Sequence, residues 1–225
     1  MRRMVIVLLA ASVAGGCGSQ NTTSQPKRDV VIGDSQEIFP SDSLRDWKSY
    51  ADHVAVYKVV DEAALPVSSE DQERGEGMVG REITITVNRL LWSAAGAPEL
   101  PSSLRIRAPG WVLHDGQRTP LMIRGGRRPE VGQQFLGPLV EIDDAGSSTW
   151  GFLTSGSSVP LEDGRAAPPA PEEYSPLRGQ LAGKSEAEIR QLVERQQPDP
   201  EAAKRGNLRP QERVVEVYRA RQDKR

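Results

Sequence analysis

The sequence predicts a mainly β protein, a small antiparallel barrel or sandwich with a short N-terminal helix and C-terminal helices. Apolar and polar residues alternate with period two, most clearly over residues 82–88, which is the repeat of a half-buried strand. Similar short segments recur between residues 53 and 161, separated by Gly-, Pro- and Asp-rich stretches. That spacing is typical of small antiparallel β folds. Helix signals dominate beyond residue 184.

The first predicted element is a short helix. Ser41 or Ser43 can cap its N-terminus, because a serine oxygen accepts from free backbone N–H groups. Leu44, Trp47 and Ala51 fall at helical spacing on one face. We therefore expect Trp47 to anchor the helix in the core.

Strands are predicted next. The segments cover residues 53–60, 82–88, 104–108, 135–142, 149–154 and, for a short sixth strand, 159–161. Successive side chains of a strand point to opposite faces, so we expect Ile85 to be buried and Thr84 to be exposed. Residues 61–80 and 114–130 are rich in charge and glycine and are expected to be loops.

The last part of the chain is expected to be a Pro-rich linker, residues 163–184, followed by a helical segment, residues 185–225. Ser185 and Glu188 have the spacing of a capping box. Pro210 is a favoured first residue of a further helix. That helix has only a narrow apolar edge, so it needs a surface to pack on.

The N-terminal residues predict export. Arg2 and Arg3 precede an uncharged apolar run, residues 4–13, and small residues then lead to Cys17. The run is too short to span a bilayer, which takes roughly 20 residues, but it suits a signal peptide. The segment resembles a bacterial lipoprotein signal, whose lipobox ends in a cysteine that is acylated. That family prefers Leu where this chain has Ala14. The alternative is an ordinary signal peptide, cut before Cys17.

The lipoprotein resemblance implies a location and a domain plan. Residues 1–16 would be removed, and Cys17 would carry fatty acyl chains such as palmitate. Residues 17–40 are polar and are expected to form a disordered tether. The tether would hold a β-barrel domain, residues 41–162, at the extracytoplasmic face of the cell membrane. Cys17 is the only cysteine, so no intramolecular disulfide can staple that domain.

Charge and motifs exclude several function classes. The formal charge is −2, and loss of Arg2 and Arg3 with the signal brings it to −4, whereas nucleic-acid binders are usually basic. A G-x-G-x-x-G match at residues 75–80 precedes a strand instead of following one, which is the wrong order for a dinucleotide site. Two histidines are too few for a structural zinc site. We expect no cofactor and no metal.

These exclusions favour a non-catalytic binding or accessory role. The sequence contains no G-x-S-x-G nucleophile elbow. The alternative is a hydrolase of unrecognised type that uses His114 and a nearby carboxylate, since Asp115 follows His114 directly.

A group of arginines is the strongest candidate contact site. The group lies around a Gly-Gly pair and consists of Arg118, Arg124, Arg127 and Arg128. Outside a cell, such a basic loop is suited to meet lipid phosphates, an anionic envelope polymer or the acidic face of a protein partner. The alternative is a solvated loop without a ligand.

Four segments carry a second resemblance: DSLRDWKSYADHVAVYKVV, GREITITVNRLLW, LRIRAPGW and VGQQFLGPLVEI. Their order resembles that of poorly characterised bacterial surface proteins over residues 42–195. The resemblance implies an OB-like barrel of about five strands, similar to the fold of tissue inhibitors of metalloproteinases. Those inhibitors use an N-terminal cysteine and disulfides that this chain lacks, so their inhibitory mechanism is not expected.

The predicted lipid anchor is testable by replacing one atom. We expect Cys17→Ser to abolish membrane retention, because the thiol is the acylation site and the chain after Cys17 has no other hydrophobic anchor. Detergent phase partitioning of the two proteins measures this. Equal recovery of both in the detergent phase would contradict the prediction.

Overall fold

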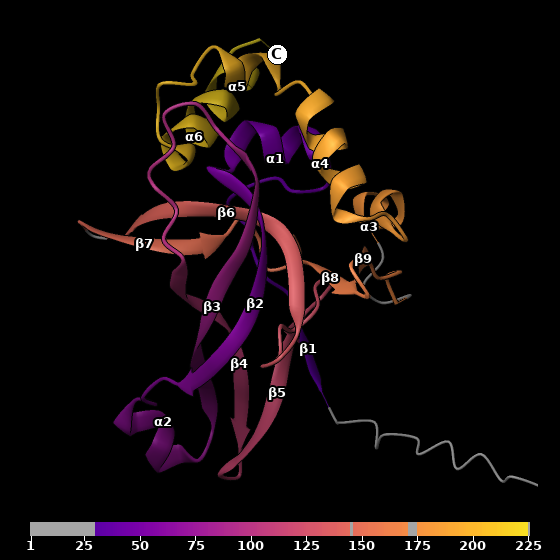
Figure 1. Ribbon diagram of the computed structural model, residues 1–225. Helices are drawn as coiled ribbons and strands as arrows, with labels where there is room; N and C mark the ends of the chain where they lie inside the picture. The colour runs from indigo at the N-terminus through magenta and orange to yellow at the C-terminus, as the bar shows by residue number, and fades with distance from the viewer. Residues whose placement is uncertain (1–29, 145, 171–174, 225) are drawn as a thin grey trace, which may run out of the picture.

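The computed structural model describes residues 30–144, 146–170 and 175–224, apart from the side chain of residue 144 (Figure 1). The described chain is mainly β, as predicted. The expected signal peptide, Cys17 and the first part of the expected tether, residues 17–29, lie outside the described residues.

One sheet contains all the labelled strands. The strands are β1 (Val31–Gly33), β2 (His53–Ala64), β3 (Gly77–Ser93), β4 (Ser103–His114), β5 (Gln117–Ile123), β6 (Gln134–Asp144), β7 (Ser147–Phe152), β8 (Val159–Glu162) and β9 (Arg165–Ala166). Their order is β1-β5-β4-β3-β2-β6-β8-β9, and β7 pairs with β6. The β1–β5 ladder is parallel.

The helices gather mainly at one end of this sheet (Figure 1). They are α1 (Leu44–Tyr50), α2 (Ser69–Arg74), α3 (Pro176–Leu181), α4 (Glu186–Arg195), α5 (Pro200–Ala203) and α6 (Pro210–Gln222). Helix α2 alone lies at the opposite end, on the connection between β2 and β3.

The sheet has nine strands and does not close, so the predicted small barrel of about five strands is wrong. β7 folds back against β4, but within the described residues no ladder joins these two strands. Aromatic rings fill the space inside the curve. Tyr57 of β2 stacks against Phe135 of β6, with ring centroids 6.1 Å apart, and against Phe152 of β7, 5.5 Å apart.

The two central strands, β2 and β6, are buried on both faces. Tyr57 and Phe135 belong to the core inside the curve of the sheet. Val56 and Leu136 point the other way and pack against the helices, together with Trp47 of α1. Trp47 is fully buried, as predicted, and α1 begins with a capping box between Ser43 and Asp46.

The C-terminal helices are part of the same domain. α4 starts with the predicted capping box, in which the Ser185 oxygen accepts from Glu188 N–H and the Glu188 carboxylate accepts from Ser185. In α6, Arg213 is buried and donates to the carbonyl of Ser49 at 2.7 Å and to that of Leu208 at 2.8 Å. Val214 and Val217 are buried beside it. The surface that this helix needed is therefore the helical layer over β2 and β6.

Several expected loops are ordered elements. The tether prediction is corrected over residues 30–40, because β1 pairs with β5 and Phe39 is buried. The predicted linker, residues 163–184, contains β9 and α3, with Leu177 and Leu181 buried. β2 and β3 extend into residues 61–80, and β5 lies within residues 114–130.

The predicted register of β3 is confirmed at Ile85, which is fully buried, whereas Thr84 is half-buried instead of exposed. Thr86, on the same face as Thr84, is exposed. We expect Ile85→Ala to cost about 2–5 kcal/mol of unfolding free energy, because it leaves a cavity in the core. Thr86→Ser is the control, which should leave stability nearly unchanged. Denaturant unfolding measures both, and comparable losses would contradict this packing.

Candidate functional site

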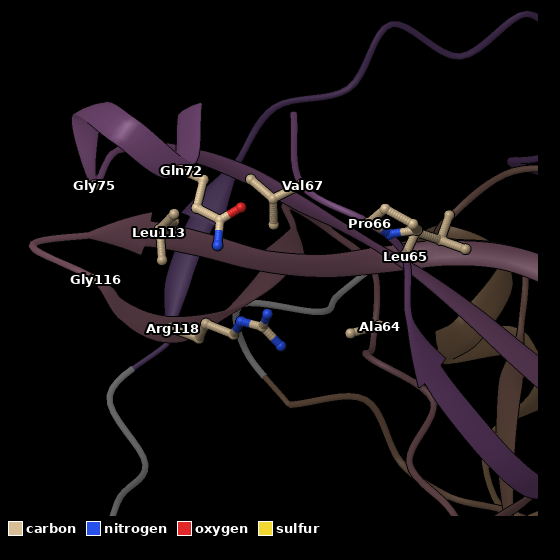
Figure 2. A pocket seen from close by; sticks show the side chains of 9 residues that line it. All are labelled: Ala64, Leu65, Pro66, Val67, Gln72, Gly75, Leu113, Gly116 and Arg118. Atoms are coloured by element: carbon tan, nitrogen blue, oxygen red, sulfur yellow. The ribbon is translucent and has the colours of Figure 1, made fainter. Parts of the chain in front are cut away.

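A cavity of about 510 Å³ lies at the end of the sheet that carries α2. We call it the hairpin pocket. Its walls come from the connection between β2 and β3, which includes α2, and from the hairpin of β4 and β5 (Figure 2). The volume falls in the range of small-molecule sites.

Local turn chemistry builds this pocket. Ser68 caps α2 by accepting from Asp71 N–H at 3.1 Å, and Gly75 ends the helix with φ of 66°. Asp115 and Gly116 both have positive φ, 49° and 74°, as a tight type I′ hairpin turn requires. Gly116 N–H donates to the Gly75 carbonyl at 3.2 Å. This hydrogen bond holds the two tips together.

The pocket has apolar walls and two polar side chains. Its apolar lining includes Leu65, Val67 and Leu113. Gln72 extends from α2 toward the hairpin, and Arg118 extends from β5 along the opening (Figure 2). Such a lining, mainly apolar with few polar groups, is typical of ligand sites.

Arg118 is exposed, and no described residue forms an ion pair with it. Arg74 of α2, at the same end of the sheet, is already paired with Glu70 at 3.5 Å and with Asp71 at 2.6 Å. Arg118 is therefore a cation that faces an apolar pocket without a partner in the described part of the protein. An anionic group of a ligand would give Arg118 an ion-pair partner.

The other arginines of the predicted group do not join Arg118 in one basic patch. Arg124 donates to Asp34 at 2.8 Å, and the guanidinium lowers the pKa of that carboxyl group through this hydrogen bond. Arg127 lies 4.0 Å from Glu162. Arg128 is buried, 8% exposed, and it is closed to an external anion.

Arg128 belongs to a buried cluster that also contains Arg81, Trp111 and two glutamates. Arg128 donates to Glu130 at 3.0 Å and to the carbonyls of Pro109 and Gly110. Its guanidinium lies 4.8 Å from the centre of the Trp111 ring. Burial lowers the pKa of Arg128, so the acceptors around it offset a real desolvation cost.

Arg81 was missed by sequence reasoning. It is 1% exposed, donates to the Pro129 carbonyl at 2.6 Å and pairs with Glu62 at 2.5 Å. A signal was present, because Arg81 has the same parity as the buried Ile83 and Ile85. An arginine on the inward face of a strand indicates a buried ion pair.

The histidines give no support to hydrolysis. His114 is exposed and lies 3.6 Å from both Glu76 and Asp115, but it does not line the hairpin pocket. Among the described residues no serine or cysteine contacts it as a nucleophile would. His53 is buried, with Nε2 donating to the Pro98 carbonyl at 2.9 Å and Nδ1 2.9 Å from the Ser93 oxygen.

The described residues contain no group of three or more His, Cys, Asp or Glu side chains arranged to hold a metal ion. None of the helices in the described ranges is both long and apolar enough to cross a membrane. Comparison with models of known protein families, with curated proteins and with solved structures found no match.

The burial of Arg128 generates a stability prediction. We expect Arg128→Gln to cost on the order of 3 kcal/mol, because it leaves Glu130 and the carbonyls of Pro109 and Gly110 without their donor. Arg124→Gln, which removes an exposed pair, should leave the unfolding midpoint unchanged. Thermal unfolding followed by circular dichroism measures both. Equal midpoints for the two variants would show that the buried cluster does not stabilise the fold.

Proposed function

We propose that the protein is a lipid-anchored component of the cell envelope, held at the extracytoplasmic face of the cell membrane, with a non-catalytic binding role. The basic, apolar and small residues that lead to Cys17 support the anchor. The anchor makes the membrane the first partner of the protein. An envelope protein that is held in place by lipid acts through what its folded domain binds.

Arg118 carries the binding part of this proposal. A guanidinium binds phosphate or carboxylate through two parallel hydrogen bonds, and Arg118 has no competing ion pair among the described residues. The walls beside it are apolar. The ligand that fits both features has an apolar part and one anionic group.

The direction of β1 supports a membrane-side position for the hairpin pocket. β1 runs parallel to β5, with Val31 opposite Leu121 and Gly33 opposite Ile123. The chain that enters Val31 therefore comes from the side on which β5 begins, beside Arg118. Residues 17–29 reach about 45 Å at most when fully extended. A lipid on Cys17 would keep this end of the domain within that distance of the bilayer.

We propose that the ligand of the hairpin pocket is an amphiphilic molecule of the cell envelope, whose headgroup carries the anionic group. An anionic envelope polymer or an acidic protein partner would instead use the exposed Arg118 and Arg124 from outside. At the same end of the sheet, Glu76 and Asp115 flank His114, and their negative charges repel a large anionic surface. A single small headgroup that enters the pocket avoids most of that repulsion.

The finer fold assignment is part of the same proposal. We propose an OB-like connectivity for the open sheet, supported by the meander β2-β3-β4, by β6 on the other side of β2 and by β7 against β4. OB folds bind ligands with the loop between their first two strands, among others. Here that loop contains α2 and forms the hairpin pocket.

Octyl phosphate is a soluble probe with the proposed chemistry. We expect it to bind the purified protein and to bind at least tenfold more tightly than octanol. Arg118→Gln should weaken octyl phosphate roughly tenfold, since a charge-assisted hydrogen bond is worth about 1.5 kcal/mol or more. Isothermal calorimetry measures these affinities, and added salt should weaken only the binding of the phosphate.

Arg105→Gln is the matched control, because Arg105 is exposed on β4 and lies 3.6 Å from Glu82, outside the pocket. It should bind octyl phosphate like the unmodified protein. Equal affinity for octanol and octyl phosphate, or equal losses in both variants, would contradict the role of Arg118. Hydrolysis of the phosphate, abolished by His114→Ala, would favour the hydrolase alternative.

A further inference from the structure

A second groove lies where the sheet fails to close. It is a cavity of about 400 Å³ between β4 and β7, and we call it the seam groove. Arg107 and Pro109 of β4 form one side, and Trp150 and Phe152 of β7 form the other. The segment before α1 adds Glu37 and Ile38, and α6 adds Gln211.

The seam groove lies beside a second cavity of about 310 Å³, and Glu37 and Thr154 line both. The second cavity is lined by hydroxyl groups, among them Ser41 and Ser157, and by charged side chains, among them Asp42. The oxygens of Ser41 and Thr154 lie 2.7 Å apart. The aromatic seam groove therefore has a polar neighbour with both hydroxyl and charged side chains.

The aromatic end offers a fixed apolar platform. Trp150 is only half-buried, and its ring centroid lies 5.5 Å from that of the buried His53. Phe152 stacks on Tyr57. Ile38, which lines the same cavity, is 67% exposed. No described residue covers this apolar surface, so a ligand can reach it.

Two polar side chains of the groove each use one polar atom in a hydrogen bond to the backbone and keep a second polar atom for a ligand. Glu37 Oε1 accepts from Ser155 N–H at 3.1 Å, and Oε2 has no partner among the described residues. Gln211 Oε1 accepts from Asp143 N–H at 3.1 Å, which leaves the Nε2 donor without a partner in the same part of the chain. A backbone N–H thus orients each side chain, and the groove presents one preorganised acceptor and one preorganised donor.

We propose that the seam groove binds a neutral oligosaccharide. A sugar ring has an apolar C–H face that stacks on an aromatic side chain, and hydroxyl groups that both donate and accept hydrogen bonds. The platform at Trp150, the acceptor of Glu37 and the donor of Gln211 match these two properties. The Glu37 carboxylate disfavours an acidic sugar, since its second oxygen would face a like charge. Arg107, the cation that lines the same groove, is already engaged in an interaction of its own.

The test uses the full chain in a detergent without a sugar headgroup. Calorimetric titration with the tetramer of N-acetylglucosamine and with maltotetraose is expected to give saturable binding of at least one. Tetragalacturonate, the acidic probe, should bind at least tenfold more weakly. Trp150→Ala, Glu37→Ala and Gln211→Ala should each weaken the neutral tetrasaccharide about tenfold or more.

Trp150 also contacts the core, so Trp150→Ala can fail to fold for reasons unrelated to binding. Glu37→Ala and Gln211→Ala change surface side chains, and they test the proposal independently of that variant. Arg118→Gln should bind the sugar normally, which separates this proposal from the function proposed for the hairpin pocket. Absence of binding of both neutral probes at millimolar concentration would overturn the proposal. So would acidic binding as tight as neutral binding, or unchanged affinity in both surface variants.

Discussion

Arg81 and Arg128 are buried against Trp111 at the point where β3 and β4 change register between Val79 and Arg81. Taking two like charges out of water is expensive, and only close acceptors offset the cost. Glu62 and Glu130 supply the countercharge. The bend itself depends on Gly110, because a Cβ there would lie 1.9 Å from the Val79 carbonyl oxygen.

This buried cluster connects the two candidate sites. Arg128 donates to the carbonyl of Pro109, and Arg81 donates to that of Pro129. Both prolines line the seam groove. Beyond the bend, β4 continues from Trp111 to the turn that closes the hairpin pocket. We therefore expect a substitution in the cluster to disturb the wall of the seam groove and to displace the hairpin pocket.

The sequence was informative where a local rule decides the structure. The Ser43 and Ser185 caps, the alternation around Ile85 and the burial of Trp47 each follow from one short segment. β5 was missed because Pro120 interrupts its pattern, although the Asp115-Gly116 turn that precedes it is a hairpin signal. Asp163-Gly164, also with positive φ at both residues, marks the turn between β8 and β9.

The candidate sites were less predictable, because they depend on pairing between distant residues. The arginine group looked basic in sequence, yet Arg124 finds Asp34, which is 90 residues away. Arg128 is withdrawn into the core. Only Arg118 keeps the predicted character of a cation without a partner in the described chain. The seam groove has no sequence motif, since its residues come from the segment before α1, from β4, β7 and α6.

Burial on both faces of the sheet explains why both sites lie at its margins. A small domain without a disulfide needs enough apolar burial to offset its conformational entropy. Here β2 and β6 obtain it from the helices on one face and from side chains of β3, β4 and β7 on the other. No room for a ligand remains at the centre. Surface that is left uncovered occurs where this double cover ends: beside the open edge of β7 and at the tip beyond the Trp111 bend. These two places hold the seam groove and the hairpin pocket.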